Sequence, residues 1–313
     1  MTLRVAIQMD PIESVDIDAD STFRIAEAAQ LRGHSLFYYH PDALCWHEGR
    51  VLAHGWPLEL RREKGNHFTL GARREVDLAE FDVVWLRQDP PFDMAYITTT
   101  HLLERLPATT QVVNDPFWVR NFPEKLLVLR FPDLIPPTII ARDLDTLRRF
   151  RDQHGEVILK PLYGNGGAGV FRLREGDSNL ASLHEMFSGI NREPLIMQAF
   201  LPAVSKGDKR VLLVDGEGVG AINRVPQKGE SRSNMHVGGI AEPAEMTERD
   251  HEICRAIGPI LRENGQVLVG IDVIGDSLTE INVTSPTGIQ ELERFDGIDV
   301  AGRIWAAIEA KRS

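Results

Sequence analysis

A glycine-rich segment preceded by a lysine is the strongest chemical signal in the sequence. Lys160 ends an apolar run, and Gly164, Asn165, Gly166 and Gly167 follow shortly after it. Glycine has no Cβ, so its backbone N–H groups can close on phosphate oxygens, and the lysine adds a positive charge. Because residues 170–173 look like another strand, this loop differs from the phosphate loops that open a helix. We expect a flexible flap between two strands; a glycine-rich hairpin with a surface lysine is the alternative.

Three oxygen-bearing side chains lie in two strand-like runs near the C-terminus. Asp272 is in the run 267–274, and Glu280 and Asn282 are in the run 278–283. The Gly275-Asp276-Ser277 turn predicts a hairpin, and side chains alternate along a strand, so Glu280 and Asn282 share one face. Such oxygens suit Mg²⁺, which is commonly shared with substrate phosphates. The alternative is that Asp272 caps the hairpin and the other two side chains are solvated.

Other candidates are weaker because each stands alone. Lys125 follows a turn, and residues 198–201 end a strand where backbone groups could pair with an adenine edge. Arg210 and Arg224 flank two predicted strands and could hold an anionic substrate or a developing phosphoryl oxygen. Each could equally be a surface residue. The polar segment 226–239 predicts a loop that either closes over a substrate or is a disordered surface loop.

Composition narrows the classes of partner. The 313 residues are 42% hydrophobic and 26% charged, with a formal charge of -11, which argues against nucleic acid or an anionic membrane as the main partner. The two cysteines, Cys45 and Cys254, lie far apart and form no zinc or disulfide pattern. Neither a membrane helix nor a signal peptide is indicated, since Asp10 interrupts the first apolar run early. We expect a cytoplasmic protein.

The order of predicted elements indicates three domains. Strand-like and helix-like runs alternate in the first third, which predicts a small, mostly parallel α/β sheet. Ligands of such sheets bind beyond the carboxyl ends of the strands, which draws attention to residues 10–11 and 87–92. A Pro-rich stretch near 122–137 precedes a small α+β lid, and β-runs dominate beyond 195, with a helix at 247–264 between them. We place the domains at 1–122, 123–200 and 201–313.

These features together resemble the ATP-grasp superfamily, and more closely its prokaryotic glutathione synthetase family. Five strings carry the resemblance over almost the whole chain: QMDPIESV, LRQDPPFD, ILKPLYGNGGAGVFR, GDKRVLLVDGE and GIDVIGDSLTEINVTSPTGIQE. The last string is specific to the family, and RQDPPFD is not shared by ATP-grasp enzymes in general. The resemblance implies an N-terminal α/β domain and two α+β lobes that clamp a nucleotide.

The resemblance also assigns roles to individual residues. It implies ATP-dependent ligation of γ-glutamylcysteine to glycine through an acyl phosphate, with Mg²⁺, or Mn²⁺ in its place, as the metal. The dipeptide and the acyl phosphate would face Arg87, Asp89, Arg210 and Arg224, and the site would be closed by Ser285, Thr287 and the 226–239 loop with Gly239. ATP would be bound by Lys125, Lys160, Gly164, Asn165, Gly166, Gly167, Gln198 and Leu201, and the metal by Asp272, Glu280 and Asn282. A homo-oligomer, either a dimer or a tetramer, would follow the family.

Two alternative functions are compatible with some of these motifs. Another ATP-grasp ligase would keep Lys160, the glycine loop and the Glu280-x-Asn282 pair, but is not expected to keep RQDPPFD. A nucleotide-binding regulator without catalysis would be expected to lose its metal ligands first, and all three are present.

Overall fold

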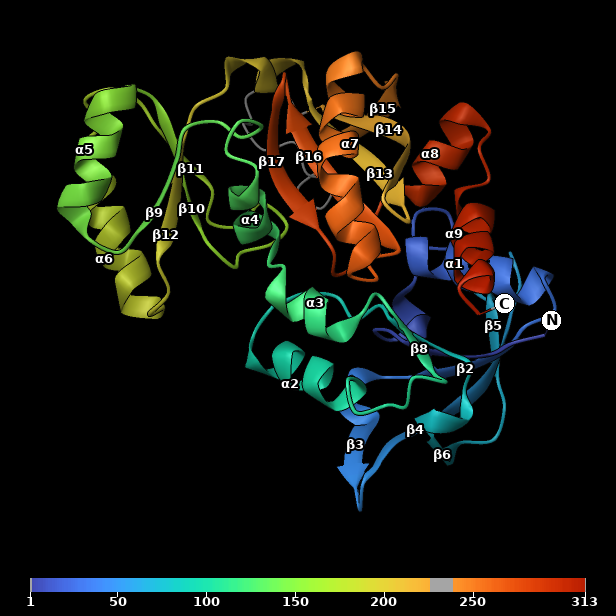
Figure 1. The fold of residues 1–313 in the computed structure, drawn as a ribbon. Helices are drawn as coiled ribbons and strands as arrows, with labels where there is room; N and C mark the ends of the chain where they lie inside the picture. Colours follow the sequence, from blue (N-terminus) through green and yellow to red (C-terminus); the bar gives the residue numbers. More distant parts are fainter. Residues whose placement is uncertain (1, 226–238, 313) are drawn as a thin grey trace.

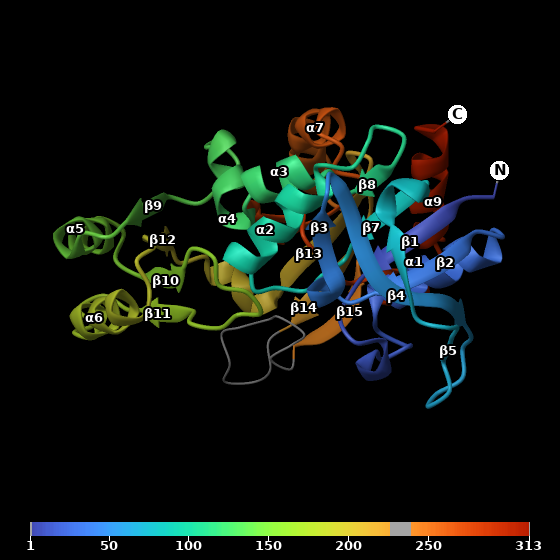
Figure 2. The ribbon, with the colours of Figure 1, turned by 90° about the horizontal axis from the view of Figure 1, so that it is seen from below.

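The first domain is built on four parallel strands. In the computed structural model, which describes residues 2–225 and 239–312, the central sheet has the order β2-β1-β7-β8. Its strands are buried, and α1, α2 and α3 cover its two faces (Figures 1 and 2). The bounds are β1 (Arg4–Gln8), β2 (Ser35–Tyr39), β7 (Val83–Leu86), β8 (Gln111–Val113), α1 (Ser21–Leu31), α2 (Met94–Leu103) and α3 (Pro116–Asn121). The predicted alternation of strands and helices is confirmed here.

The expectation of a small, mostly parallel sheet is wrong beyond β2. There β4 pairs antiparallel with β2 and carries three further strands, so the whole sheet has eight. Polar and charged residues interrupt this region, so it lacks the continuous apolar runs that mark buried parallel strands. The added strands are β3 (Leu44–His47), β4 (Arg50–Leu60), β5 (Phe68–Leu70) and β6 (Arg74–Asp77).

The second unit is the predicted lid. Four antiparallel strands in the order β11-β10-β12-β9 pack on two helices, and this layer stands apart at the left of Figure 1. Its core joins Leu147 and Phe150 of α5 to Leu159 and Met197 of the sheet. The bounds are β9 (Thr138–Ala141), β10 (Val157–Pro161), β11 (Phe171–Leu173), β12 (Leu195–Ala199), α5 (Leu144–His154) and α6 (Leu180–Ile190).

The third unit is an antiparallel sheet with two chemically different faces. Its order is β15-β14-β13-β16-β17, and the predicted hairpin of β16 and β17 is confirmed. Alternation along β13 sends Val211 and Leu213 toward α7, whereas Arg210 lies on the opposite face. The predicted helix at 247–264 is confirmed as α7, and a capping box of Thr247 and Asp250 starts it. The bounds are β13 (Asp208–Val214), β14 (Glu217–Val225), β15 (Ile240–Ala244), β16 (Leu268–Ile274), β17 (Ser277–Asn282) and α7 (Glu248–Glu263).

The C-terminal helices return to the first domain. α8 (Ile289–Asp296) and α9 (Val300–Ala310) lie beside α1, and both chain ends are on this side of the molecule (Figures 1 and 2). Trp305 is fully buried, and its indole N–H donates to the Ile25 carbonyl at 2.8 Å. Ile304 and Ile308 of α9 join the same apolar core as Val5 and Ile7 of β1. One hydrophobic core therefore spans the beginning and the end of the chain.

A buried asparagine fastens the first sheet to the third unit. Asn114 follows β8, and its amide donates to the carbonyls of Leu268 (2.7 Å) and Val283 (2.8 Å). Its side-chain oxygen accepts from the Leu268 N–H at 3.0 Å. Because buried backbone groups that lose their partners are costly, these three bonds hold the two sheets in one relative position.

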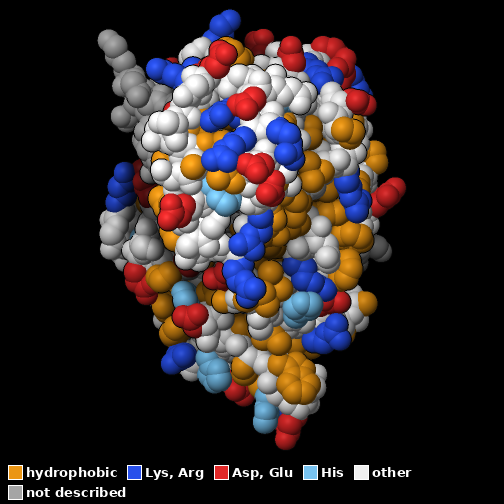
Figure 3. All heavy atoms as spheres, turned by 90° about the vertical axis from the view of Figure 1, so that its left-hand side faces the viewer, with side chains coloured by type: hydrophobic (Ala, Val, Ile, Leu, Met, Phe, Trp, Pro, Cys, Tyr) orange, Lys and Arg blue, Asp and Glu red, His pale blue; other side chains and the backbone are white. Residues whose placement is uncertain are grey.

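The surface on the lid side is mixed in character. Lys and Arg side chains lie among acidic and hydrophobic ones on this face, and no single extended basic surface is visible (Figure 3). Within residues 2–225 and 239–312, no helix combines the length and the hydrophobicity needed to cross a membrane.

The His34→Gln variant should lose part of the acid sensitivity of folding. The Leu3 N–H donates to His34 Nδ1 at 3.2 Å, which leaves the proton on Nε2, 3.0 Å from Glu309 Oε1. Burial lowers the pKa of His34, while Glu309 acts in the opposite direction. The folded chain therefore binds fewer protons at His34 than the unfolded chain. This contribution to stability is present above the ordinary imidazole pKa of about 6.5 and is lost as pH falls through the lowered folded pKa.

Urea unfolding at about pH 7.5 and about pH 5.5 measures this effect as the loss of unfolding free energy between the two conditions. His47→Gln is the matched control, because the His47 side chain is 65% exposed. An equal acid-induced loss in wild type and both variants would contradict the assignment.

Candidate active site

Lys160 and Glu280 meet between the lid and the third unit. Lys160 leaves β10 and Glu280 lies on β17, yet Lys160 Nζ is 3.0 Å from Glu280 Oε1. Burial alone would raise the pKa of Glu280, but Lys125 and Lys160 hold it below its usual range. The two segments singled out in the sequence thus meet at one point.

Lys125 joins this pair from a third direction. It lies in the short helix α4 (Glu124–Leu127), is buried, and donates to the Gly164 carbonyl at 2.6 Å. Its Nζ is also 3.7 Å from Glu280 Oε1 and contacts the Glu124 carboxylate. Burial, with the nearby Glu280 charge, raises the pKa of Glu124. Two lysines and two carboxylates are therefore concentrated at the base of the glycine loop.

The glycine loop connects two antiparallel strands, as predicted. β10 pairs with β11 from Val157↔Leu173 to Leu159↔Phe171, so the chain reverses through residues 162–170. Gly166 and Gly167 have φ of 63° and 79°, a region that strongly favours glycine. At Gly164, which lies between them and Lys160, a Cβ would come within 2.6 Å of Pro161 Cγ. Asn165 is exposed, so the tip of the loop is open to a ligand.

Arg210, Asp272 and Arg224 form a buried charge cluster on the same face as Glu280. Register places Arg210 of β13 opposite Asp272 of β16, and Asp272 opposite Glu280 of β17. Asp272 Oδ1 accepts from Arg210 Nε at 2.6 Å and lies 3.0 Å from Arg224 Nη2. Although burial acts the other way, the two guanidinium groups lower the pKa of Asp272. Arg224 also donates to Asp208 Oδ2 at 2.6 Å, so one carboxylate on each side orients it.

The expected metal ligands differ in whether their side-chain atoms already have partners. Both Asp272 oxygens are taken by arginines, since Arg210 Nη2 reaches Oδ2 at 3.2 Å. Both lysine contacts of Glu280 go to Oε1, which leaves Oε2 for another partner. Asn282 follows on the same face of β17 and is buried, and its amide nitrogen has no hydrogen-bond partner among the residues that the structure describes. Amide oxygen and nitrogen are interchangeable assignments, so this orphaned group fits an oxygen ligand. Glu280 and Asn282 therefore fit a divalent cation better than Asp272 does.

No three His, Cys, Asp or Glu side chains come together as a metal cluster in the described part of the chain. A site made from one carboxylate and one amide suits Mg²⁺, which keeps waters and takes further oxygens from phosphates.

Arg87 occupies a second buried position, at the end of β7. Its Nε donates to Thr22 Oγ1 at 2.9 Å and its Nη2 to the Pro286 carbonyl at 3.2 Å. Within residues 2–225 and 239–312, its buried Nη1 has no hydrogen-bond partner. Burial lowers the pKa of this guanidinium, although Asp89 and Asp20 counteract it. An anionic group would satisfy the remaining donor.

The remaining substrate candidates lie around Arg87. Ser285 donates to Asp89 Oδ1 at 2.9 Å, and Arg210 Nη1 is 3.4 Å from the Thr287 carbonyl. The first bond joins the RQDPPFD loop to the SPT segment, which is far from it in sequence, and the second joins β13 to the same segment. Gly239 is described just before β15, but residues 226–238 of the predicted closing loop lie outside the described residues.

The adenine candidates lie at the end of β12. Gln198 is buried and donates to Thr138 Oγ1 at 3.1 Å. The N–H groups of Ala199 and Phe200 already donate to the Pro137 and Glu156 carbonyls. Leu201 follows outside the strand and is half-buried. The backbone groups available to a base are therefore those nearer Leu201.

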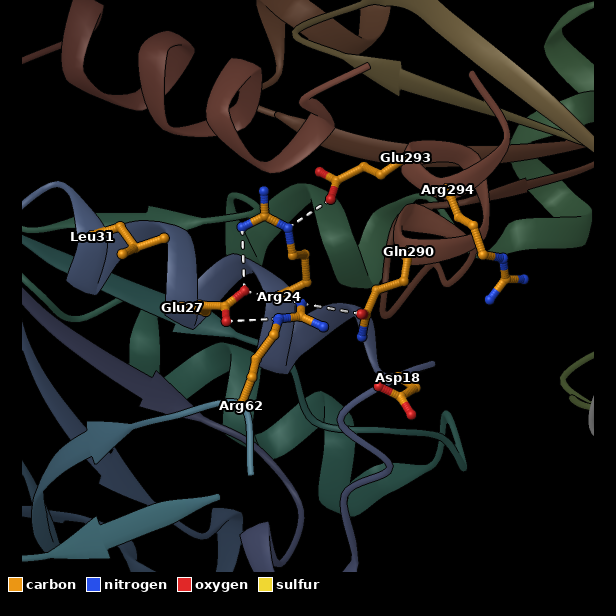
Figure 4. A pocket seen from close by; sticks show the side chains of 8 residues that line it. All are labelled: Asp18, Arg24, Glu27, Leu31, Arg62, Gln290, Glu293 and Arg294. Atoms are coloured by element: carbon orange, nitrogen blue, oxygen red, sulfur yellow. Dashed lines mark hydrogen bonds and ion pairs between the residues drawn. The ribbon is translucent and has the colours of Figure 1, made fainter. Parts of the chain in front are cut away.

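A separate hollow lies between α1 and α8 (Figure 4). Its charges neutralise one another: Arg24 Nε is 2.6 Å from Glu293 and Arg62 Nε is 2.7 Å from Glu27. We assign it no ligand. The hollow is lined by Asp18, Arg24, Glu27, Leu31, Arg62, Gln290, Glu293 and Arg294.

Several residues of the site gave no signal in the sequence. Thr22 and Asp208 orient Arg87 and Arg224, and Glu124 shares Lys125 with Glu280. Glu124 adjoins a flagged lysine and Asp208 lies two positions before Arg210, so proximity could have suggested them. Thr22 lies in α1, far in sequence from Arg87, and only the fold brings the two residues together.

The fold is that of the ATP-grasp enzymes. Two solved structures share the fold over nearly the whole chain: D-cycloserine synthetase DcsG, with a TM-score of 0.69, 17% identity and coverage of 99% of this chain and 100% of that one, and a RimK domain ATP-grasp protein from Sphaerobacter thermophilus, with a TM-score of 0.65, 17% identity and coverage of 97% and 98%.

Family comparisons narrow the class. The prokaryotic glutathione synthetase N-terminal domain matches residues 3–120, and the ATP-grasp domain of the same family matches residues 124–297. Glutathione synthetase of Mesorhizobium japonicum is 58% identical over 312 residues, covering 100% of both chains. That of Pseudomonas putida is 43% identical, covering 99% of both. The chain belongs to the prokaryotic glutathione synthetase family.

Replacing Asp272 by alanine should strongly destabilise the fold. The change leaves two buried guanidinium groups facing each other, and breaking a buried ion pair typically costs ~3–5 kcal/mol. Asp152→Ala is the control, because Asp152 pairs with Arg151 at the surface with its side chain 65% exposed. Such a surface pair is worth about 1 kcal/mol or less. Urea unfolding measures the loss of unfolding free energy in both variants. Similar losses would show that the Asp272 cluster contributes no more to stability than a surface ion pair.

Proposed function

We propose that the chain joins γ-glutamylcysteine to glycine and forms glutathione while ATP is converted to ADP and phosphate. The family membership supports this activity over the whole chain. The single observation that carries the residue assignments is the 3.0 Å contact between Lys160 Nζ and Glu280 Oε1. It brings a phosphate-binding flap and an oxygen-ligand strand to the same point, where one triphosphate would be held.

The nucleotide half of the proposed mechanism rests on Lys125 and Lys160. Both ammonium groups already neutralise Glu280, and they would divide their charge between it and the phosphate oxygens when ATP enters. The flap of residues 164–169 would supply backbone N–H groups over the phosphates. Glu280 and Asn282 would hold Mg²⁺, which spreads negative charge at the transferred phosphoryl group.

The acceptor half rests on three arginines. Arg87 Nη1 would bind a carboxylate of the dipeptide, because this buried donor has no partner in the described part of the chain. The dipeptide's glycine-accepting carboxylate would attack the γ-phosphorus, releasing ADP and giving an acyl phosphate. The glycine amine would then attack the acyl carbon, and phosphate would leave. Arg210 and Arg224, held by Asp272, would stabilise the oxyanion of that tetrahedral intermediate.

The enzyme needs no nucleophilic side chain in this scheme. Its own task is to position charge and keep water from the acyl phosphate, which hydrolyses readily. The two arginines are pre-oriented by carboxylates, so little rearrangement accompanies the developing negative charge.

Phosphate release from ATP tests the activity directly. Release that requires γ-glutamylcysteine and rises with glycine supports the proposal. Release with a different acid or amine pair would identify another ATP-grasp ligase, and absence of release with retained nucleotide binding would identify a regulator. Removing the metal with a chelator should abolish release, and Mg²⁺ should restore it, with Mn²⁺ as a substitute.

We also infer a cytoplasmic homo-oligomer, a dimer or a tetramer. ATP and thiol substrates favour the cytoplasm, and large apolar side chains such as Trp46 (54% exposed) and Met94 (70% exposed) are available for subunit contacts. We propose that the chain divides into three domains, at residues 1–122, 123–200 and 201–313. Light scattering of the purified protein measures the subunit number.

Glu280→Gln should reduce kcat by about a hundredfold to a thousandfold. The amide keeps the shape of the side chain but cannot neutralise a cation, and one electrostatic contact of this kind is typically worth ~3–4 kcal/mol in the transition state. Glu280→Ala should abolish ligation. Glu217→Ala, at a 79% exposed carboxylate of the same unit, is the control for general effects. Near-normal turnover of folded Glu280→Ala, checked by its melting curve, would refute the metal assignment.

Arg87→Ala should raise the KM for γ-glutamylcysteine by about tenfold to a hundredfold, the range expected for a lost charged hydrogen bond. The KM for ATP should change much less, since Lys125 and Lys160 lie elsewhere. Arg87→Lys keeps the charge but not the fork geometry and should be intermediate. Arg105→Ala, at a 58% exposed arginine of the same domain, is the control. A larger effect on ATP would move the dipeptide site away from Arg87.

A further inference from the structure

A ring contact joins the glycine flap to the RQDPPFD loop. Tyr163 is the residue directly before Gly164, and its ring stacks on Phe92 with a centroid distance of 6.0 Å and an interplanar angle of 25°. The two residues come from the lid and the N-terminal domain, so the contact crosses between units. Neither residue has a role in the phosphate or carboxylate chemistry described above.

Both ends of this contact are anchored to binding residues. On the flap side, Leu162 is buried and the Gly164 carbonyl accepts from Lys125 at 2.6 Å, so the neighbours of Tyr163 are fixed. On the other side, Phe92 packs on Tyr96 at 5.4 Å. Tyr96 is fully buried, and although burial raises the pKa of its phenol, the Arg87 guanidinium beside it acts in the opposite direction. A chain of contacts thus links Lys125, through Tyr163 and Phe92, to Tyr96 beside Arg87.

Tyr163 is 37% exposed, unlike the core aromatics. An exposed contact between two units can open without breaking a hydrophobic core, and offset aromatic pairs favour the closed arrangement modestly. Those properties suit a contact that forms and breaks during each turnover.

We propose that Tyr163 is a positioning residue that couples the nucleotide site to the dipeptide site by stacking on Phe92 when the flap is closed. This inference rests on the proposed function, because it concerns how the two substrates of that reaction influence each other. ATP draws the flap down through Lys125, Lys160 and the loop amides. The closed flap then presents the Tyr163 ring to Phe92 and fixes the loop that carries Arg87 and Asp89. Each ligand therefore favours the flap position that the other needs.

The coupling is reciprocal by thermodynamic necessity. If a nucleotide tightens dipeptide binding by a given factor, the dipeptide tightens nucleotide binding by the same factor. Calorimetry with a non-hydrolysable ATP analogue, Mg²⁺ and γ-glutamylcysteine measures both factors in the absence of glycine.

Tyr163→Leu should lower both coupling factors by about twofold to tenfold, the range expected for one aromatic pair. Phe92→Leu should do the same, and the double variant should be no worse than either single one, because both remove one contact. Tyr163→Phe keeps the ring and should retain the coupling. Phe117→Leu is the matched control, since Phe117 is a 40% exposed aromatic that makes an edge-to-face contact with Trp118 within the N-terminal domain.

Steady-state kinetics gives the second measurement. Loss of the coupling should raise the dipeptide KM at saturating ATP with little change in kcat, which a general loss of structure would not do. Unchanged coupling in Tyr163→Leu, or single effects that simply add in the double variant, would overturn the proposal. Wild-type protein that forms no glutathione in the same assays would instead refute the proposed function, so the two failures are distinguishable.

Discussion

Glu280 is the carboxylate toward which the two lobes of the nucleotide clamp are organised. Lys160 reaches it from the lid and Lys125 from the helix between lid and sheet, so a single oxygen holds three segments together by charge. Burying these charges is tolerable only because they are paired. A triphosphate with a divalent cation brings charges of both signs and can replace this pairing on each side. Under the proposed function, this arrangement is electrostatically preformed for such a ligand.

The molecule separates a rigid part from a part that can move. The third unit is fixed to the first by Asn114 and by the core shared with α9, whereas the lid contacts the rest through exposed or charged side chains such as Tyr163 and Lys160. Arg210 and Ser285 stand on the part that these contacts fix. Under our proposal, the position of the flap affects the acceptor side only through the loop that carries Phe92 and Arg87. The lid therefore differs from the other two units in the kind of contact that attaches it.

Local signals explain which parts of this picture could be predicted from the sequence. The glycine loop, the β16–β17 hairpin and the capped helix α7 depend on residues near one another, and each was predicted with its type and approximate ends. The pairing of Asp272 with Arg210 depends on the register of β13 against β16, which no local pattern specifies. Thr22, Asn114 and the Phe92–Tyr163 contact depend on tertiary placement alone. The antiparallel strands β3–β6 were missed because partly exposed strands with charged residues lack the apolar runs used to recognise the parallel ones.

The contribution of α9 to the first core affects the order in which the protein can fold. Val5 and Ile7 of β1 share this core with Trp305 and Ile308 of α9, which are synthesised much later. On the ribosome, the N-terminal sheet must therefore wait with part of its apolar surface uncovered until α9 leaves the exit tunnel. Synthesis of α9, rather than completion of the first domain, allows that core to close. Until then the nascent chain exposes hydrophobic surface of the kind that chaperones shield.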